Sequence, residues 1–388
     1  MKTKKISFII KLLAAFLSVS VLMGISIFAD SEEEYPDLGL TCKSAVLMEA
    51  STGKILYAKN MDEALPPASV TKVMTLLLVM EDIDSGKLKY TDTVTASAYA
   101  ASMGGSQIYL KEGESMSVED LLKSVVIASA NDAAVALAEH IAGSESAFVA
   151  RMNQRAQELG MTATNFENTN GLDDTAVNHV TSAHDIAIMS RELIKHRKIL
   201  DYSSIWMDSI RDGSFGLTNT NRLVRFYKGA TGLKTGSTSK AKFCISATAC
   251  REGMDLICVI MAADTRDIRN EEAKRLLDWG YANYELLRYM PKTLDPIKVL
   301  GGTENSLTIK HEGGSFVVKK GDSSNVKEII ELPQTLSAPV KKGDAVGKIK
   351  LEVAGKAIGE LEIKSENDVP KISFWQFFGR TIKRFFLK

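Results

Sequence analysis

The sequence carries no excess charge of either sign and contains little cysteine. Its 48 Lys and Arg residues balance its 48 Asp and Glu residues. The chain therefore has no general positive field of the kind that attracts nucleic acid. Four cysteines in 388 residues are too few for a fold held together mainly by disulfides. We therefore expect neither nucleic-acid binding nor a disulfide-built scaffold.

The sequence also lacks the residue spacings of a metal site. Its five histidines form no His-Glu-x-x-His motif, and His179 and His184 lie five residues apart. The acidic pair Asp173-Asp174 follows Asn170-Gly171, a combination that is typical of a turn. We predict no metal and no other cofactor, and we assign the histidines structural or surface roles.

The first 29 residues have the pattern of an export signal. Three lysines in residues 1–5 precede an apolar run over residues 6–28, and Ala29 offers a small residue for cleavage. The run is long enough to cross a bilayer, so an uncleaved N-terminal anchor is the competing interpretation. In both cases the remaining chain is predicted to lie outside the cytoplasm.

Three of the cysteines fall in the apolar stretch 243–263, which is predicted to form two strands turning at residues 251–253. Buried thiols that serve as small apolar side chains are the simpler interpretation. A bridge from Cys258 to Cys244 or Cys250 stays open, because disulfides persist in exported proteins.

The order of the predicted elements indicates an α/β catalytic domain over residues 30–290. Residues 44–59 alternate and turn at Ser51-Thr52-Gly53, as a β-hairpin does. We predict helices or helical regions over residues 68–80, 117–141, 185–196 and 270–287. The N-terminal hairpin and the strands of residues 243–263 are expected to share one sheet.

The character of the chain changes after residue 291. Residues 295–369 alternate between apolar and polar residues and are interrupted by glycine pairs and Lys-Gly-Asp turns, which predicts a small all-β sandwich domain. Residues 370–388 are rich in aromatic and basic residues at helical spacing. This amphipathic segment is too short and too charged to span a membrane, and we predict that it anchors the chain to a membrane surface. A terminal helix docked on the body of the protein is the alternative.

Three short motifs carry the chemistry, in the order Ser69-Val70-Thr71-Lys72, Ser129-Ala130-Asn131 and Lys234-Thr235-Gly236. Ser69 and Lys72 share one face of a helix, so the amine can reach the hydroxyl and act as its base. Burial would lower the pKa of the lysine and favour the neutral amine that a base requires. Each motif alone is common, whereas the ordered set is specific to penicillin-binding proteins and active-site-serine β-lactamases.

With these motifs the chain resembles the low-molecular-mass penicillin-binding proteins, the family of serine D-Ala-D-Ala carboxypeptidases. The resemblance extends over the segments PPASVTKVMT, GGSQIYLKEGESMSVEDLL, IASANDAAVALAEHIAGS, FENTNGLDD and GLKTGSTSKA. It implies a penicillin-binding, serine β-lactamase-like transpeptidase fold with a small C-terminal all-β domain. It also implies that the substrate is a peptidoglycan stem pentapeptide and that β-lactam antibiotics are covalent inhibitors.

The resemblance assigns roles to the residues of the first two motifs. Ser69 forms the acyl-enzyme, and Lys72 is its base. Ser129 relays a proton toward the leaving D-alanine, and Asn131 hydrogen-bonds the substrate amide. The backbone N–H groups of Ser69 and Ser237 would form the oxyanion hole.

The third motif is implied to bind the substrate. Lys234 and Thr235 would bind the region of the terminal carboxylate, and Gly236 would permit close docking of the substrate backbone. Arg269 resembles the arginine that neutralises this carboxylate in the family. Arg222 and Arg225 receive no role from the resemblance.

Three alternatives stay open from the sequence. A β-lactamase needs a deacylating carboxylate, for which Glu167 is the candidate, but its spacing of three to Asn170 is one short of the class A pattern. A DD-endopeptidase would share all three motifs. A catalytically silent peptidoglycan-binding protein is the alternative from a different class.

Overall fold

The computed structural model describes residues 35–173 and 176–386, and the side chains up to residue 383 within the last helix. The predicted export signal, residues 1–29, lies outside this part of the chain. The central element is a five-stranded antiparallel sheet in the order β2-β1-β9-β8-β7. Its strands are β1 (Ser44–Glu49), β2 (Ile55–Lys59), β7 (Ala230–Thr238), β8 (Lys242–Arg251) and β9 (Met254–Ala263).

The hairpin predicted for residues 44–59 forms the edge of this sheet. At its turn the Glu49 carboxylate accepts hydrogen bonds from the backbone N–H groups and hydroxyls of Ser51 and Thr52. Gly53 follows with φ of +75°, a conformation that glycine adopts without strain. The prediction that the hairpin and residues 243–263 share one sheet is confirmed by the pairing of β1 with β9.

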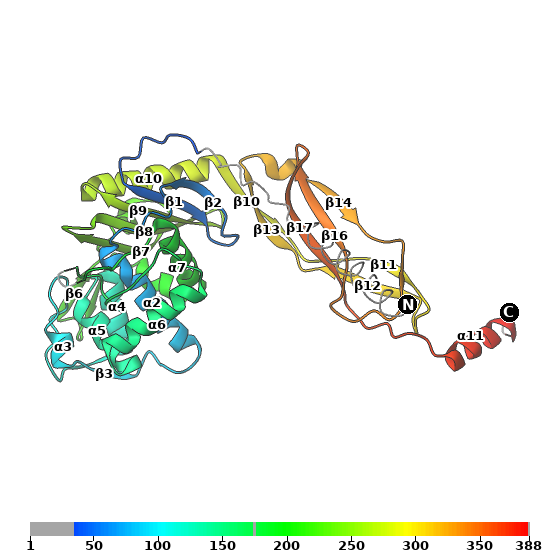
Figure 1. The fold of residues 1–388 in the computed structure, drawn as a ribbon, viewed down its shortest axis with the longest axis horizontal. Coiled ribbons are helices and arrows are strands. Elements are labelled where there is room, and N and C mark those ends of the chain that lie inside the picture. Colours follow the sequence, from blue (N-terminus) through cyan, green and yellow to red (C-terminus); the bar gives the residue numbers. More distant parts are fainter. Residues whose placement is uncertain (1–34, 174–175, 387–388) are drawn as a thin grey trace, which may run out of the picture. The chain divides into compact units, whose positions relative to one another are not determined.

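Helices cover both faces of the sheet (Figure 1). On one face α10 (Arg266–Asn283) packs against β8 and β9, and on the other α7 (Ala183–Lys195) packs against β1 and β9. Next to α7 lies α2 (Lys72–Asp84), in which ten of 13 residues are buried, so it forms the centre of the helical layer. The other helices of this region are η1 (Ala68–Thr71), α3 (Ala98–Ala101), α4 (Val118–Ile127), α5 (Asn131–Ala142), α6 (Glu145–Glu158), α8 (Lys198–Ser203) and α9 (Leu223–Phe226).

Two predicted helices differ from the observed ones. The region 117–141 is two helices, α4 and α5, because the backbone between them turns at Ser129 with φ of +64°. The helix predicted for residues 270–287 runs instead from Arg266 to Asn283. It ends early because the next six residues, β10 (Tyr284–Tyr289), pair with β13 (Gly314–Lys319), a long-range contact that local pattern does not reveal.

The cysteines in this sheet are thiols. Cys244 and Cys258 are fully buried, and Cys250 is partly buried. Cys258 lies opposite Ala247 and Cys250 lies opposite Asp255, so neither bridge left open by the sequence forms in the structure. The simpler interpretation, small apolar side chains in the core, describes them.

The C-terminal β domain is built on a six-stranded sheet in the order β14-β16-β17-β12-β11-β15. Its strands are β11 (Lys292–Leu300), β12 (Ser306–His311), β14 (Lys327–Glu331), β15 (Thr335–Ser337), β16 (Ala345–Val353) and β17 (Lys356–Ser365). Eleven buried aliphatic residues, Leu307 and Leu351 among them, form its own apolar core. The predicted fold class, an α/β region followed by an all-β one, is confirmed.

The chain ends in α11 (Phe374–Phe386). The Arg380 guanidinium donates to the carbonyl oxygens of Gly302 and Thr303, while four aromatic side chains of the helix are exposed. Among the described helices, none combines the length and the apolar character needed to cross a membrane.

Three smaller pieces complete the fold. They are the two-stranded sheets of β3 (Thr93–Thr95) with β4 (Ser115–Ser117) and of β5 (Met207–Ile210) with β6 (Phe215–Thr218), and the short helix η2 (Asp322–Asn325).

Candidate active site

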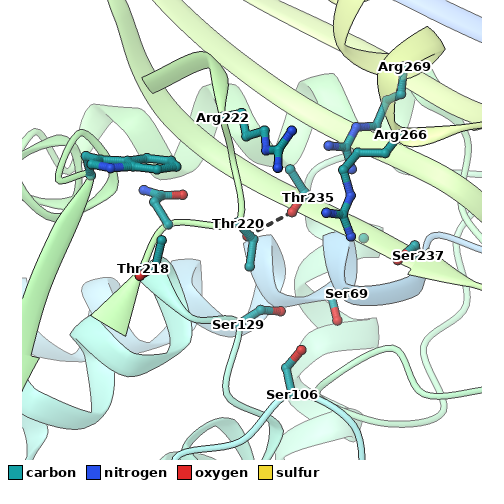
Figure 2. A pocket seen from close by; sticks show the side chains of 13 residues that line it. Ser69, Ser106, Ser129, Thr218, Thr220, Arg222, Thr235, Ser237, Arg266 and Arg269 are labelled. Atoms are coloured by element: carbon teal, nitrogen blue, oxygen red, sulfur yellow. Dashed lines mark hydrogen bonds between the residues drawn. The ribbon is translucent and has the colours of Figure 1, made fainter. Parts of the chain in front are cut away.

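A cavity of about 400 Å³ opens where the start of the α2 region meets the edge strand β7. Figure 2 shows the residues around it, with Ser69 and Ser129 at the helical side and Thr235 and Ser237 on the strand. The lining residues are Ser69, Ser106, Ser129, Trp206, Thr218, Asn219, Thr220, Arg222, Thr235, Gly236, Ser237, Arg266 and Arg269.

Ser69 sits in the short helix η1, directly before α2. The first N–H groups of a helix have no partner within it, so the backbone around Ser69 offers donors to a ligand. Gly171 packs directly against this segment, and only a glycine fits there, since a Cβ would lie 1.9 Å from the Ala68 carbonyl oxygen. The position of the nucleophile therefore depends on a glycine more than 100 residues away in the sequence.

Lys72 is completely buried, and its Nζ has three neighbours in the protein. It lies 2.9 Å from Ser69 Oγ, 2.6 Å from Asn131 Oδ1 and 2.7 Å from the Asn170 carbonyl oxygen. A neutral amine has two N–H donors and one lone pair. The two carbonyl oxygens can only accept hydrogen bonds, so they use both N–H groups of the neutral amine. The lone pair on the nitrogen is then free to accept the proton of the Ser69 hydroxyl. This geometry suits a base that removes the proton of Ser69.

The electrostatic environment favours the neutral amine. Burial, followed by the positive charge of Lys234, lowers the pKa of Lys72 well below its usual value, against an opposing effect of Asp132. Burial and the charge of Arg269 also lower the pKa of Lys234, to about 7. The positive charge of Lys234 therefore discourages a proton on Lys72.

The second motif lies at the break between α4 and α5. Ser129 lines the cavity with 4% of its surface exposed, and its positive φ turns its side chain out of the helical path. The Asn131 side chain donates to the Gly104 carbonyl oxygen at 2.7 Å, which fixes Oδ1 toward Lys72. One N–H of the amide is left for a ligand.

Lys234, Thr235 and Gly236 lie on β7, as predicted. Lys234 Nζ donates to its neighbour's carbonyl oxygen at 2.8 Å, and the Thr235 hydroxyl lies 2.8 Å from that of Thr220. A Cβ at Gly236 would lie 2.7 Å from the Ser69 backbone nitrogen. The glycine is therefore needed for the strand to approach the nucleophile, in addition to any role toward a substrate.

Arg269 lines the far end of the cavity from the first turns of α10. The residue is 3% exposed, and its guanidinium donates to the Asn270 side chain and to the Cys244 carbonyl oxygen. Burial, followed by the charge of Arg266, lowers the pKa of Arg269 to about 10. The structure thus brings every predicted site residue to one cavity or, for Lys72, Asn131 and Lys234, directly behind it.

Sequence reasoning missed several groups at this site. Ser106 lines the cavity, and its carbonyl oxygen accepts from the Asn131 backbone at 2.7 Å. The Asn170 carbonyl contacts Lys72, and Arg266 lines the cavity together with Arg222, which the sequence analysis named without a role. Ser106 stands next to a Gly-Gly pair, which was a usable signal, whereas a backbone carbonyl leaves no signal in the residue type.

His179 supports the nucleophile from the opposite side of η1. Its Nδ1 accepts a hydrogen bond from the Glu167 backbone, so Nε2 carries the proton and donates to the Thr71 hydroxyl at 2.7 Å. That hydroxyl donates to the Ala68 carbonyl oxygen. Burial lowers the pKa of His179 to about 4, so the ring is neutral at ordinary pH. The structural role predicted for this histidine fits these contacts.

The cavity is cationic and has no carboxylate on it. None of the described residues that line it is Asp or Glu. The Glu167 carboxylate accepts hydrogen bonds from the backbone N–H groups of Val177 and Asn178 and does not line the cavity. Within the described residues no group of three His, Cys, Asp or Glu side chains is placed to hold a metal ion.

A serine beside a buried lysine, with a second serine and a cationic strand opposite, defines an active-site-serine acyltransferase. Comparisons with known proteins agree with this class. Residues 30–265 match the family model of D-alanyl-D-alanine carboxypeptidase, and residues 292–371 match that of the C-terminal domain of penicillin-binding protein 5. The chain belongs to the D-alanyl-D-alanine carboxypeptidase family.

Individual relatives are similar over most of their length. D-alanyl-D-alanine carboxypeptidase DacF of Bacillus subtilis is 43% identical over 353 residues, which cover 89% of this chain and 90% of the relative. DacC of Escherichia coli is 34% identical over 386 residues, covering 95% and 93%. The predicted family, and with it the predicted class of enzyme, is confirmed.

Solved structures give the same result for the fold. The crystal structure of penicillin-binding protein 5 from Haemophilus influenzae matches with a TM-score of 0.79 at 34% identity, covering 87% of this chain and 99% of that one. Penicillin-binding protein D2 from Listeria monocytogenes, solved in an ampicillin-bound form, matches with a TM-score of 0.59 at 31% identity, covering 63% and 100%. The predicted penicillin-binding fold is confirmed.

Proposed function

We propose that this chain removes the terminal D-alanine from peptidoglycan stem pentapeptides through an acyl-enzyme on Ser69. The observation that carries the proposal is the contact of Lys72 with Ser69 Oγ, combined with two acceptors that occupy both N–H groups of a neutral amine. β-Lactam antibiotics present a reactive carbonyl to the same serine and would be covalent inhibitors. No metal or other cofactor takes part in the proposed steps.

The acylation step uses groups that are already in contact. Lys72 takes the Ser69 proton as Oγ attacks the carbonyl carbon between the two D-alanines. The developing oxyanion is stabilised by the backbone N–H groups of Ser69 and Ser237, which the close approach of β7 at Gly236 brings together. Ser129 passes a proton to the leaving amine, and Asn131 holds the substrate amide.

The terminal carboxylate is attracted by the charge of the cavity. Lys234 lies behind its surface, whereas Arg269 and Thr235 line it. No lining residue among those described carries a negative charge that would compete. A substrate that ends in a free carboxylate therefore suits this cavity better than a neutral one.

A β-lactamase is disfavoured by the position of Glu167. A deacylating carboxylate must activate water against the acyl-enzyme. Glu167 instead uses both carboxylate oxygens to hold the backbone of residues 177–178. We therefore expect a penicilloyl adduct on Ser69 that persists well beyond seconds, and turnover within seconds would favour the β-lactamase.

The test combines covalent labelling with product analysis. Wild-type protein should take up fluorescent penicillin and release free D-alanine from a pentapeptide, and Ser69→Ala should do neither. Folded wild-type protein without label would support a silent binding protein. Cleavage of cross-bridges alone, detected by mass spectrometry, would replace the carboxypeptidase by a DD-endopeptidase.

We further propose that the chain is exported, with residues 1–29 as its signal, and acts on the outer face of the cytoplasmic membrane as a peripheral protein. In this arrangement residues 30–290 are the catalytic domain, 295–369 a β-sandwich domain and 370–388 an anchoring helix. Support comes from α11, where Phe374, Trp375, Phe377 and Phe378 are between 49% and 77% exposed on a helix that also carries Arg380 and Lys383.

Deleting residues 370–388 from the mature chain tests the anchor. The shortened protein should leave membrane vesicles in a flotation assay and keep its labelling by penicillin. Persistent flotation of a chain that lacks both residues 1–29 and residues 370–388 would contradict the proposed anchor.

A further inference from the structure

A buried carboxylate lies behind the active-site cavity, on the residue that follows the second motif. Asp132 belongs to the first turn of α5 and has no exposed surface. Its carboxylate accepts hydrogen bonds from the backbone N–H groups of Ile108, Leu110 and Ala133 at distances between 2.9 and 3.2 Å. Backbone donors and the start of a helix favour the ionised form of a carboxylate. Within the described part of the chain Asp132 has no ion-pair partner, so its negative charge is buried without a cation in contact.

This charge acts on the base of the proposed reaction. The neighbouring residue, Asn131, contacts Lys72 Nζ through Oδ1 at 2.6 Å, which brings the start of α5 against the amine. Because neither Lys72 nor Asp132 is exposed to water, salt and solvent screen their interaction weakly. Burial and the charge of Lys234 lower the pKa of Lys72, and Asp132 opposes them. Of the two charges that act on Lys72, Asp132 is therefore the one that favours a proton there.

The other titratable groups around this end of α2 do not replace Asp132. They are Glu139 on α5, Glu145 on α6, Glu167, Asp173 and His179 between α6 and α7, and Arg269 on α10. None of them is among the groups that shift the pKa of Lys72. His179 is neutral at ordinary pH, because burial lowers its pKa to about 4. Glu145 is engaged with the backbone and hydroxyl of Thr169.

The acylation step creates a charge that needs a partner. When Ser69 gives its proton to Lys72, the neutral amine becomes an ammonium inside the protein, and the positive charge of Lys234 opposes this change. None of the described residues that line the cavity is acidic, so no carboxylate on its surface can offset the new charge. A fixed negative charge behind the cavity stabilises the ammonium as it forms and lowers the barrier to the attack.

We propose that Asp132 is the buried counter-charge of the base, a positioning residue that stabilises protonated Lys72 while Ser69 attacks and that never touches the substrate. The proton moves from Ser69 Oγ to Lys72 Nζ as the bond from Oγ to the carbonyl carbon forms. It then passes through Ser129 to the leaving nitrogen as the carbon–nitrogen bond breaks, and Asp132 stays ionised throughout. The inference rests on the proposed acyl-enzyme reaction and adds the group that makes Lys72 a strong enough base.

The same carboxylate also has a structural contact that the experiment must separate. Ile108 and Leu110, which donate to Asp132, follow Ser106, which lines the cavity (Figure 2). Arg211 holds this segment from another side, since its Nη1 donates to the Ile108 carbonyl oxygen at 2.9 Å. Arg211→Gln therefore loosens the segment and leaves the negative charge of Asp132 in place.

The experiment measures the rate at which benzylpenicillin acylates the full-length enzyme between about pH 5 and about pH 10. The acid limb of the profile reports loss of the proton from the base. Asp132→Asn should lower the maximum rate by about 10- to 100-fold. It should also move the acid limb to lower pH, because Lys72 without its counter-charge is a weaker base that loses its proton sooner. The alkaline limb should stay where Lys234 contributes to it, since burial and Arg269 are what lower the pKa of Lys234.

Two controls separate the charge from general damage. Arg211→Gln should lower the rate with the acid limb in its wild-type position. Glu139→Gln removes another carboxylate of α5, one that accepts from the Ser97 hydroxyl at 2.6 Å, and it should leave both the rate and the acid limb unchanged. If Asp132→Asn does not fold, as judged by near-UV circular dichroism, Asp132→Ser removes the same charge and is measured in its place.

The outcomes that overturn the inference are distinct from failure of the proposed reaction. An acid limb that stays in place in Asp132→Asn, or that moves equally in Arg211→Gln, would refute the counter-charge and leave Asp132 with a structural role. An unchanged maximum rate in Asp132→Asn would refute it as well. A wild type that forms no acyl-enzyme with penicillin at any pH would instead refute the reaction itself.

Discussion

The catalytic region and the C-terminal β domain differ in whether their charged side chains are buried. In the catalytic region Lys72 and Lys234 have no exposed surface, and Arg269 has 3%. Within residues 292–371, which the structure describes throughout, the only buried polar residues are His311 and Ser365. Several lysines of this domain pair with glutamates at the surface, as Lys348 does with Glu360. Since a buried charge costs free energy, the catalytic region bears that cost both at its site and at structural carboxylates such as Glu49.

The largest effect is expected from removing the buried amine. Lys72→Met keeps the length of the side chain and should lower the rate of Ser69 acylation by penicillin by about 10³-fold or more, because no base remains. Unfolding by urea should show a stability change within about 2 kcal/mol, since a buried amine is lost together with its hydrogen bonds.

Its matched control lies in the other region. Lys348→Met removes a surface lysine that pairs with Glu360 at 3.0 Å, and it should change stability by less than about 1 kcal/mol and leave acylation alone. Normal acylation by Lys72→Met would contradict the assignment of the base.

The second prediction concerns a core substitution that destabilises the β domain and not the active site. Leu351 is completely buried in the apolar core of that domain. Leu351→Ala should destabilise the domain by about 2–5 kcal/mol through the lost apolar contacts and the cavity left behind. The rate of penicillin labelling at a temperature where both regions stay folded should not change. A parallel loss of labelling would mean that the site depends on the β domain for its geometry.

The third prediction concerns the approach of β7 to the nucleophile. Gly236→Ala would place a Cβ 2.7 Å from the Ser69 backbone nitrogen and 2.8 Å from the Pro67 carbonyl oxygen. The strand or η1 must then shift, and we expect kcat/KM to fall by about 100-fold, with about 1–3 kcal/mol of lost stability. Gly216→Ala is the control, because a Cβ there meets no atom within 4 Å. Equal kinetics for the two variants would remove the proposed reason for this glycine.

Much of the fold and of the site was readable because the signals are local. The hairpin of residues 44–59 shows its alternation and its Gly53 turn, and Ser69 and Lys72 are three residues apart on one helical segment. The ordered set of motifs added Ser129, Asn131 and residues 234–236, which the fold brings together. The roles of these residues remain proposals.

The rest depends on contacts between distant segments. The break at Ser129 arises from a backbone angle, and the early end of α10 arises from pairing with β13. The Asn170 carbonyl that binds Lys72 belongs to the backbone and could have come from any residue type. Arg222 was visible in the sequence, but only the cavity shows that it faces Thr235 rather than solvent alone.

The last prediction concerns the pH dependence of stability in the two regions. His179 has a pKa of about 4 in the folded protein because it is buried, against an ordinary value of 6.5. Above pH 6.5 the ring is neutral in both the folded and the unfolded states, so its contribution to stability does not depend on pH. As the pH falls from 6.5 to 4, the unfolded state binds the proton first, and stability should decrease by roughly 2–3 kcal/mol.

Replacing His179 tests this linkage. His179→Gln should be less stable at pH 7.5, because the contacts to Thr71 and the Glu167 backbone are disturbed, but its stability should vary less between pH 6.5 and 4. His311→Gln provides the comparison in the β domain, where burial also lowers the pKa of the histidine. Urea unfolding over the pH range measures both. If only His311→Gln flattened the profile, the acid-sensitive group would lie in the β domain rather than beneath the nucleophile, and the proposed coupling of His179 to η1 would have no support from stability.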